Sequence, residues 1–457
     1  MKLYSVRIHS NSHEELKRLE KFDFDLQYRI SKKTEEDYYE VPGILTNEEI
    51  EKVKQSGYQV EIIEDLNKVA AERQLEVSSV NRFNITNIAL EEMDDTALGG
   101  YMTADEIETA LIRLSEQFPN LITLIELPNQ TWDGRTSRAV RLRAGTNPNR
   151  TGVLFTGSMH AREWGGSDIC INFLRRLITS YQSNTQLTFG GKTYTSSEIH
   201  NFMEKLDIFV FPDVNPDGKH YSQTTDPNSG TESNMWWRKN RNPNTSTGGT
   251  HLGVDINRNF DYLWNSGIGT SSNPPSFIYK GTGPFSEPET RNVRYLFNTY
   301  RNIRYYIDIH SYGSLILYPW GDDENQGTDP NQNFQNSSFD QNRGRIGDMT
   351  YKEYMPVIDQ NTLLNLANRM YEALHSVRGI SYTVKQSAKL YEPSGTSATS
   401  IDYTYSRHIV DSTKSKVYGF TIEFGQEFVP PYQEMLQIID DVNAAMTEFC
   451  HTIKNNT

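Results

Sequence analysis

Hydrophobic patterning predicts a small separate domain at the start of the chain. Residues 3–8 alternate as in a β-strand, and a helical pattern follows. The runs DLQYRIS and DYYEVPGI then predict two strands. Thr46 and Glu49 form a capping-box pattern at the start of a second helix, and YQVEIIED predicts a last strand. This βαββαβ order predicts an α+β, ferredoxin-like domain over residues 1–65.

A connector follows over residues 66–98. The run KVAAERQLEV predicts a helix, whereas the rest of the segment is rich in turn-forming and acidic residues and predicts a mobile linker. Arg73 and Arg82 lie in this connector. If it is loose, we expect both to be accessible to a trypsin-like protease.

Residues 99–457 alternate amphipathic helices with short apolar strands such as GVLFTGS, RYYIDIH and VYGFTIEFG. Such alternation predicts an α/β domain with a mixed, largely parallel twisted sheet and helices on both faces. The Asn- and Asp-rich segment from residue 322 to 354 interrupts the pattern, and we expect a long surface excursion there.

Composition narrows the classes of partner. Asp and Glu outnumber Lys and Arg by 59 to 45, and the net charge is −14, whereas nucleic-acid binding needs a basic face. No apolar run is long enough to span a membrane, and Met1 leads into a strand pattern instead of a signal peptide. We expect Cys170 and Cys450 to be buried, reduced thiols.

Three separate pieces of sequence suggest a metal site. His160 and Glu163 follow the strand GVLFTGS, and His310 ends the strand RYYIDIH, where open α/β sheets place their sites. Each piece alone is also explained by structural hydrogen bonding. Together, two histidines and a glutamate form a recurring catalytic zinc set that leaves a fourth position open. Glu423 lies inside an apolar strand, which is costly for a carboxylate unless it is paired or acts as a general base.

Two polar runs between the strands supply further candidates. MWWRKNR contains Arg238, and GVDINRNFDYLW contains Asp255, Asn257 and Arg258. Taken singly, each is explained more simply as a solvated surface or turn residue.

The order of these pieces resembles the zinc carboxypeptidases of the pancreatic A/B, funnel-shaped (M14) type, from about Tyr101 to the end of the chain. The matching stretches are HAREW, VNPDG, WRKNR, GVDINRNF, GTGPFSEPET, HSYGSLILYPW, SIDYTY and FTIEFG. The N-terminal unit is similar to the pro-domain of that family. The resemblance implies a zinc-dependent exopeptidase that hydrolyses the C-terminal bond of peptides and proteins. It also implies a secreted, monomeric protein made as a zymogen, although this sequence shows no signal peptide.

The resemblance also implies roles for the reactive residues. One Zn²⁺ would be held by His160, Glu163 and His310. Asp255 would orient His160 from behind. Glu423 would act as the general base on the water, and Arg238 would stabilise the developing oxyanion.

Further matches imply substrate contacts, which would come from Arg162, Asn257, Arg258, Ser311, Tyr312 and Tyr391. Asn257 and Arg258 would bind the free α-carboxylate, for which a planar guanidinium is suited. Arg162 would assist along the access path, and Tyr391 would close over the substrate. Ser311 and Tyr312 would line the neighbouring subsite.

The same matches place Ile401 at the base of the specificity pocket, with Leu317, Gly321 and Thr421 in its walls. An apolar base offers nothing to pair with a lysine or arginine side chain. We therefore expect the release of aromatic and large aliphatic C-terminal residues. This register depends on the loop between Tyr391 and Ile401, which is longer than in the pancreatic enzymes.

Alternatives remain open at this point. The N-terminal domain could be removed by an activating protease, or it could stay attached and only aid folding. The site could act on wall peptides or other amides instead of ordinary peptides. The chain could also be an inactive binding homologue, although both histidines and both glutamates are present.

Overall fold

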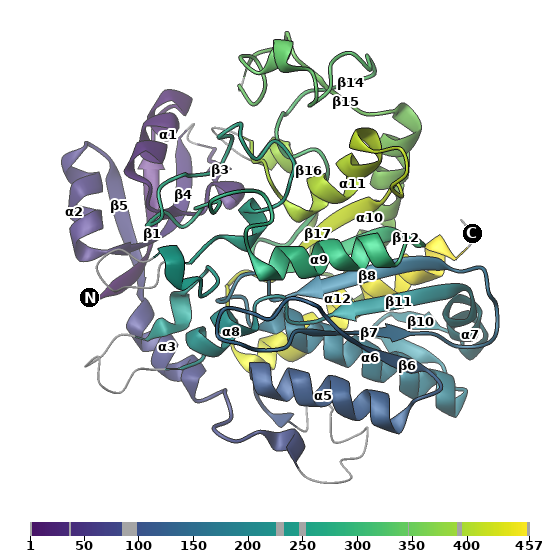
Figure 1. Ribbon diagram of the computed structural model, residues 1–457. Coiled ribbons are helices and arrows are strands. Elements are labelled where there is room, and N and C mark those ends of the chain that lie inside the picture. The colour runs from purple at the N-terminus through teal and green to yellow at the C-terminus, as the bar shows by residue number, and fades with distance from the viewer. Residues whose placement is uncertain are drawn as a thin grey trace.

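The computed structural model describes residues 2–35, 38–84, 98–224, 233–245, 253–345, 347–390 and 395–454. The larger domain is built on an eight-stranded sheet (Figure 1). Its strands are β6 (Ile122–Glu126), β7 (Arg138–Leu142), β8 (Thr151–Gly157), β11 (Leu206–Phe211), β12 (Ile303–Ser311), β13 (Leu315–Tyr318), β16 (Thr383–Gln386) and β17 (Tyr418–Phe424). Their order is β16-β13-β17-β12-β8-β11-β7-β6.

The centre of this sheet is parallel. Strand β8 pairs in parallel with β11 and β12, and β12 pairs in parallel with β17. Antiparallel pairs β13–β17, β7–β11 and β6–β7 flank the centre. The predicted mixed, largely parallel sheet is therefore confirmed.

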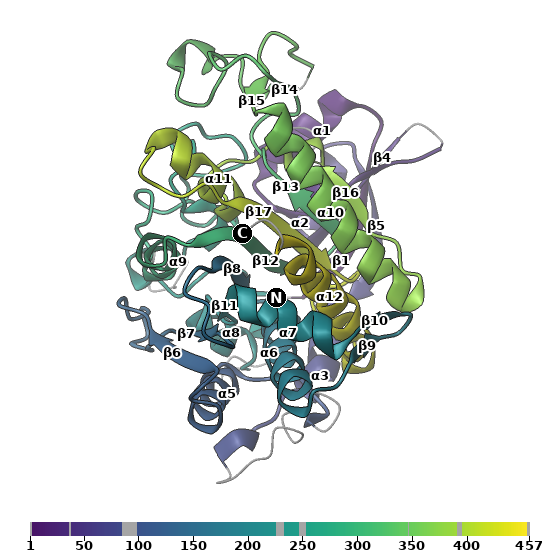
Figure 2. The same cartoon turned by 90° about the vertical axis from the view of Figure 1, so that its right-hand side faces the viewer.

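Helices cover both faces of the sheet. They are α5 (Ala104–Gln117), α6 (Gly165–Ser183), α7 (Ser196–Lys205), α8 (Pro216–Ser222), α9 (Pro288–Thr299), α10 (Val357–Arg378), α11 (Ser400–Val410) and α12 (Tyr432–Ile453). Figure 2 shows α9 and α11 on one side of the sheet and α10 and α12 on the other. Within the described ranges, no helix is both long and apolar enough to cross a membrane.

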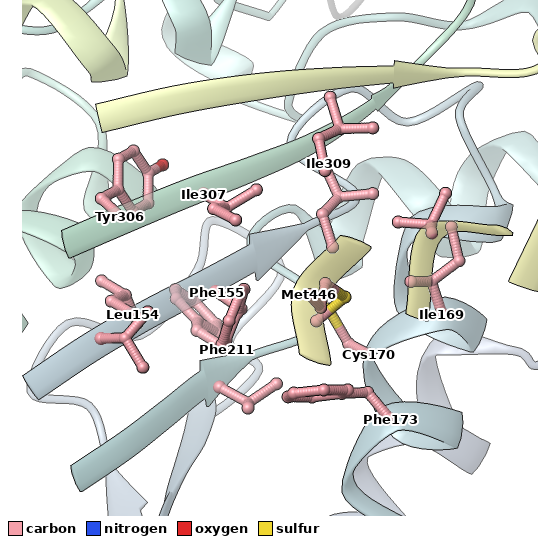
Figure 3. Packing of buried hydrophobic residues seen from close by; sticks show 14 of the residues in the cluster. Leu154, Phe155, Ile169, Cys170, Phe173, Phe211, Tyr306, Ile307, Ile309 and Met446 are labelled. Atoms are coloured by element: carbon pink, nitrogen blue, oxygen red, sulfur yellow. The ribbon is translucent and has the colours of Figure 1, made fainter. Parts of the chain in front are cut away.

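The core lies between the central strands and helices α6 and α12. Phe155 of β8 and Ile307 of β12 pack with Phe173 of α6 and Met446 of α12 (Figure 3). Parallel strands covered on both faces read as continuous apolar runs, as GVLFTGS does. Cys170 also lies in this core, and both it and Cys450 are buried free thiols, as expected.

Two short strand pairs lie outside the main sheet, the first antiparallel and the second parallel. They are β9 (Leu187–Phe189) with β10 (Lys192–Tyr194), and β14 (Gln326–Gly327) with β15 (Glu353–Tyr354). The second pair joins the two ends of the excursion at residues 322–354. A 3₁₀ turn, Ser337–Phe339, is the longest helical element within that excursion among its described residues.

The small N-terminal domain has a sheet and a core of its own. Its elements are β1 (Leu3–Ser10), α1 (His13–Leu19), β2 (Asp25–Leu26), β3 (Lys32–Lys33), β4 (Tyr39–Thr46), α2 (Asn47–Gln55) and β5 (Gln59–Asp65). Its strands pair in the order β2-β4-β1-β5. The predicted capping box is present, because Thr46 and Glu49 exchange hydrogen bonds between side chain and backbone.

The strand predicted for DLQYRIS is not continuous. Residues 25–33 instead form β2, a 3₁₀ turn (Tyr28–Ile30) and β3. The side chains of Asp25 and Arg29 reach the larger domain, where they contact Arg162 and Glu423 respectively. Asp25 belongs to β2, which pairs with β4, whereas Arg29 lies in the 3₁₀ turn that interrupts the predicted strand.

The connector begins with helix α3 (Leu66–Gln74), which packs into the core of the larger domain through Leu66 and Val69. Arg73 is buried, and its Nε donates to the carbonyl of Val429 at 3.0 Å. The expected accessibility of Arg73 is therefore not found. The predicted mobile linker falls mostly on residues 85–97, which lie outside the described residues.

The expected accessibility of Arg82 is not found either, because hydrogen bonds hold its side chain. Its guanidinium donates to both carboxylate oxygens of Glu106 (2.6 and 2.8 Å) and to the carbonyls of Leu98, Gly100 and Tyr101. The Glu106 side chain in α5 is fully buried. The pair thus fastens the end of the connector to the larger domain.

Replacing Arg82 with alanine leaves the Glu106 carboxylate buried without its charge partner. We expect a loss of about 3–5 kcal/mol in the free energy of unfolding, measured by urea denaturation. The control is Arg113→Ala, which removes a largely exposed ion pair of the same helix with Glu116 and should cost at most about 1 kcal/mol. Equal shifts of the two midpoints would contradict the prediction.

Candidate active site

The parallel centre of the sheet brings the reactive side chains to one edge. His310 near the end of β12 pairs directly with Glu423 of β17. His160 and Glu163 lie in the short loop that joins the end of β8 to α6. Because parallel strands end at the same edge, residues more than 260 positions apart in the chain meet there.

His160, Glu163 and His310 form a group that could hold a metal ion. The Nδ1 atoms of the two histidines lie 3.1 Å apart. The two Glu163 oxygens lie 2.8 Å from His160 Nδ1 and 2.9 Å from His310 Nδ1. Zinc binds imidazole nitrogen and carboxylate oxygen at about 2.0–2.2 Å. One ion between these atoms accounts for their convergence, so the residues fit zinc.

Two buried carboxylates lie behind the histidines. Asp255 Oδ1 is 3.2 Å from Nε2 of His160, and Asp308 Oδ2 is 2.9 Å from Nε2 of His310. A carboxylate on the far nitrogen fixes the tautomer that leaves Nδ1 free to bind a metal. Each histidine of the group therefore has a carboxylate beside its Nε2 atom, with a hydrogen bond formed at His160.

Asp255 also holds Arg238. The Nε and Nη2 atoms of Arg238 donate to Asp255 Oδ2 at 3.1 and 2.9 Å, so one carboxylate positions both Arg238 and His160. Burial alone would raise the pKa of Asp255, but Arg238, Arg258 and His160 outweigh burial and hold it well below its usual range. Asp255 is thus an anion that orders a cation on one side and an imidazole on the other.

The small domain inserts two charged side chains into this site. Arg29 forms an ion pair with Glu423. Asp25 accepts hydrogen bonds from Arg162, one of them at 3.0 Å from Nη2 to Oδ1, and Arg162 also lies over the ring of Phe428. The candidate base and one candidate substrate-binding arginine are therefore both engaged by residues of the first domain.

The candidate carboxylate-binding pair lies close to the metal group. Arg258 donates through Nε to the carbonyl of Gly269 (2.9 Å) and through Nη1 to that of Asn257 (2.7 Å). The Oδ1 atom of Asn257 accepts the N–H of Ser400 at 2.8 Å. Backbone groups thus fix the orientation of both side chains.

Ser311 and Tyr312 border the same site. Ser311 Oγ donates to the carbonyl of Phe428 at 2.9 Å, and its N–H donates to Glu163 at 3.3 Å. Tyr312 packs edge-on against Phe428 with ring centroids 4.7 Å apart. Both belong to the wall of the cavity described next.

A cavity of about 590 Å³ lies between the two domains. On the side of the larger domain it is bordered by His160, Arg162, Glu163, Arg238, Arg258, Ser311, Tyr312 and Glu423. The side chains expected to form the specificity pocket do not border it. These are Leu317, Ile401 and Thr421, which are buried, and Gly321 does not border it either. Tyr391 lies outside the described residues.

Four contributors were missed by reasoning from the sequence. Asp308 could have been found, because it lies two residues before His310 in an apolar strand and so shares its face. It is also a buried charge of the same kind as Glu423. No sequence pattern marks Phe428, since its carbonyl and ring reach their partners only in the folded protein. The roles of Asp25 and Arg29 depend on domain packing, which no local pattern records.

Comparison with known proteins identifies the class to which this fold and site belong. Residues 107–445 match the family model of the zinc carboxypeptidases (Peptidase_M14). Mouse carboxypeptidase A4 is 27% identical over 337 residues, covering 74% of this chain and 65% of its own. Carboxypeptidase B of Helicoverpa zea is 32% identical over 227 residues, covering 49% and 47%. The matched part thus spans less than two thirds of either relative.

The crystal structure of carboxypeptidase A from Helicoverpa armigera shares the fold. It superposes with a TM-score of 0.72 at 19% identity and covers 99% of this chain and 98% of its own. The overlap includes the small first domain. Because the family model matches about three quarters of the sequence, the chain belongs to the zinc carboxypeptidase family.

Substituting Asp255 should weaken metal binding. In Asp255→Ala, His160 loses its partner, and we expect zinc affinity to fall about 10- to 100-fold. Competition with a chromophoric chelator measures this directly. Asp261→Asn, an exposed position of the same segment, is the control and should bind zinc like the wild type. An unchanged affinity in Asp255→Ala would contradict the role of the carboxylate.

Proposed function

We propose that this protein is a zinc-dependent metallocarboxypeptidase that releases the C-terminal residue of peptides and proteins. The observation that carries the proposal is the convergence of four groups from distant parts of the chain. His160, Glu163 and His310 lie with Glu423 at one edge of the sheet, and Arg258 borders the same cavity.

The protein's own groups account for the hydrolysis steps. Zinc, when bound, supplies Lewis-acid chemistry and makes water easier to deprotonate. Glu423 takes a proton from the attacking water through its carboxylate and passes it to the nitrogen of the leaving amine. The guanidinium of Arg238, held by Asp255, stabilises the negative charge that develops on the scissile carbonyl oxygen.

Cleavage at the chain end follows from recognition of the terminal carboxylate. Arg258 offers a fixed guanidinium fork, and the engaged Oδ1 of Asn257 leaves its NH₂ group to face a carboxylate. Arg162 would guide the carboxylate inward once Asp25 is removed. A peptide bond in the middle of a chain is not followed by a free α-carboxylate. Arg258 and Asn257 therefore could not hold that bond in position for cleavage.

The proposed substrates end in aromatic or large aliphatic residues. Among the described residues of the larger domain that border the cavity, the carboxylates are Glu163 and Glu423. Both belong to the reactive group, and neither is available to pair with a lysine or arginine side chain of the substrate. The relatives carry both A and B names, so they leave the preference open.

Glu423→Gln should lower kcat by at least about a hundredfold, because amide nitrogen cannot take the proton. The assay is mass spectrometry of peptides ending in Phe, Leu, Arg or Glu, with and without a zinc chelator. The matched control is Glu427→Gln, an exposed glutamate four residues later. Trimming of Phe or Leu that survives both Glu423→Gln and the chelator would refute the proposal. Removal of Arg alone would keep the chemistry and refute the preference.

We further propose that the first domain makes the protein a zymogen. Arg29 pairs with the candidate base, and Asp25 pairs with Arg162. A substrate needs the same groups, so it cannot bind productively while these ion pairs persist. A domain that only aided folding would not need a cation on Glu423.

The activating protease is proposed to cut beside an acidic or apolar residue. Residues 83–98 contain neither Lys nor Arg. The nearest basic residues of the connector, Arg73 and Arg82, are held by the larger domain. A protease specific for basic residues would therefore find them poorly accessible.

In uncut protein, Arg29→Ala should raise activity toward a short peptide ending in Phe at least about tenfold, because it frees Glu423. Arg18→Ala, an exposed arginine of the same domain, is the control and should leave activity unchanged. Removing the first domain by limited proteolysis should raise activity further. Equal activity of uncut and cut wild-type protein would refute the zymogen proposal.

A further inference from the structure

The wall of the cavity next to Arg258 comes from three loops far apart in the sequence. Ile268 and Gly269 belong to the loop after Arg258, Gly344 to the excursion at residues 322–354, and Thr396 to the segment before α11. Hydrogen bonds link the wall, since Arg258 Nε donates to the Gly269 carbonyl and Ser397 N–H to the Ile268 carbonyl at 3.0 Å. The wall therefore lies beside the group proposed to bind the α-carboxylate of the substrate.

We propose that Gly344, together with Ile268, closes the pocket for the C-terminal side chain and sets the largest side chain that fits. The inference rests on the proposed carboxypeptidase activity and names a specificity-determining residue within it. It also gives the excursion a function. That segment supplies a wall of the pocket and is not only a surface loop.

The geometry at Gly344 leaves no spare volume. A Cβ atom added there would lie 2.8 Å from Ile268 Cδ1 and 3.0 Å from the carbonyl oxygen of Asp322. The backbone is in the left-handed region with φ of +69°, and the Gly344 N–H donates to Asp323 Oδ2 at 2.9 Å. Gly344 thus lies directly against Ile268, with its position fixed from the other side.

The excursion is anchored well enough to serve as a wall. The buried side chain of Arg343 donates to Asp340 (2.6 Å) and to the hydroxyl of Tyr351 (3.3 Å). Phe334 packs against the stacked rings of Tyr262 and Trp320, with centroid distances of 5.0 and 5.7 Å. Phe334 thus ties the part before Gly344 to residues outside the excursion, and Trp320 Nε1 donates to the carbonyl of Tyr354 at 3.0 Å after it.

The chemistry of the wall favours an uncharged side chain. Ile268 presents methyl groups, and Gly269 and Gly344 present only backbone. Asp402 lies behind the wall, where its carboxylate accepts the Gly321 N–H and the Thr399 hydroxyl. Burial, reinforced by Asp322, raises the pKa of Asp402 to about 8. A basic side chain in the pocket therefore meets no directly facing anion among the described wall residues.

The test compares two glycine-to-alanine variants of the same loop. Gly344→Ala adds a methyl group against Ile268. Gly347→Ala adds the same methyl group at a similar φ of +77°, where nothing lies within 4 Å. Each protein, activated like the wild type, is assayed for kcat/KM with peptides ending in Phe and in Ala, and its thermal unfolding is recorded.

We expect Gly344→Ala to lower the Phe-to-Ala ratio of kcat/KM about tenfold or more, the effect of one methyl group in a tight pocket. Gly347→Ala should keep the wild-type ratio. Ile268→Ala should raise the Phe-to-Ala ratio of kcat/KM. In the double variant with Gly344→Ala, it should restore much of the ratio that Gly344→Ala loses. It also provides the measurement if Gly344→Ala fails to fold.

Equal ratios in all variants, with trimming intact, would overturn the pocket assignment and leave the proposed activity standing. Absence of trimming by the wild type with zinc bound would instead refute the activity itself. A preference for peptides ending in Arg or Lys would overturn the inference that the wall favours an uncharged side chain.

Discussion

The site depends on the parallel register of β8, β12 and β17. Because successive side chains of a strand alternate between faces, a shift of one residue in β17 would turn Glu423 away from His310. Close packing on both faces of these strands holds the register, since a slip would move Phe420 out of the packing made for it and bring side chains of other sizes into its place. Core packing and catalytic geometry are therefore maintained by the same pairing.

Buried charge imposes a second constraint. The site contains four buried carboxylates close together: Glu163, Asp255, Asp308 and Glu423. Such a concentration of carboxylates is stable only with nearby cations or metal. Arg238 supplies one cation, the metal would supply another, and the first domain supplies a third through Arg29. The inserted domain therefore compensates the site electrostatically as well as covering it.

Much of the fold could be predicted from local patterns, because long apolar strands and capped helices are determined near their own residues. The metal-binding group could be predicted for the same reason, because His160, Glu163 and His310 each follow or end a strand with a clear apolar pattern. The segment at residues 25–33 was predicted as one strand, but a 3₁₀ turn at Tyr28–Ile30 divides it, and Arg29 of that turn pairs with Glu423 of the larger domain. The specificity pocket built on Ile401 stays a prediction, because no local pattern records which distant loops meet to line a pocket.

The division of the hydrophobic cores affects what happens after the chain is cut. Helix α3 and Phe83 pack with the larger domain, whereas residues such as Val6, Leu16 and Val53 form a core of the first domain alone. While the chain is intact, the first domain is held at an effective concentration set by its short tether. Once the tether is broken, its rebinding becomes bimolecular and depends on dilution. Under the zymogen mechanism proposed above, the cleaved first domain would act as a separate inhibitor, and its occupancy of the site would depend on its concentration.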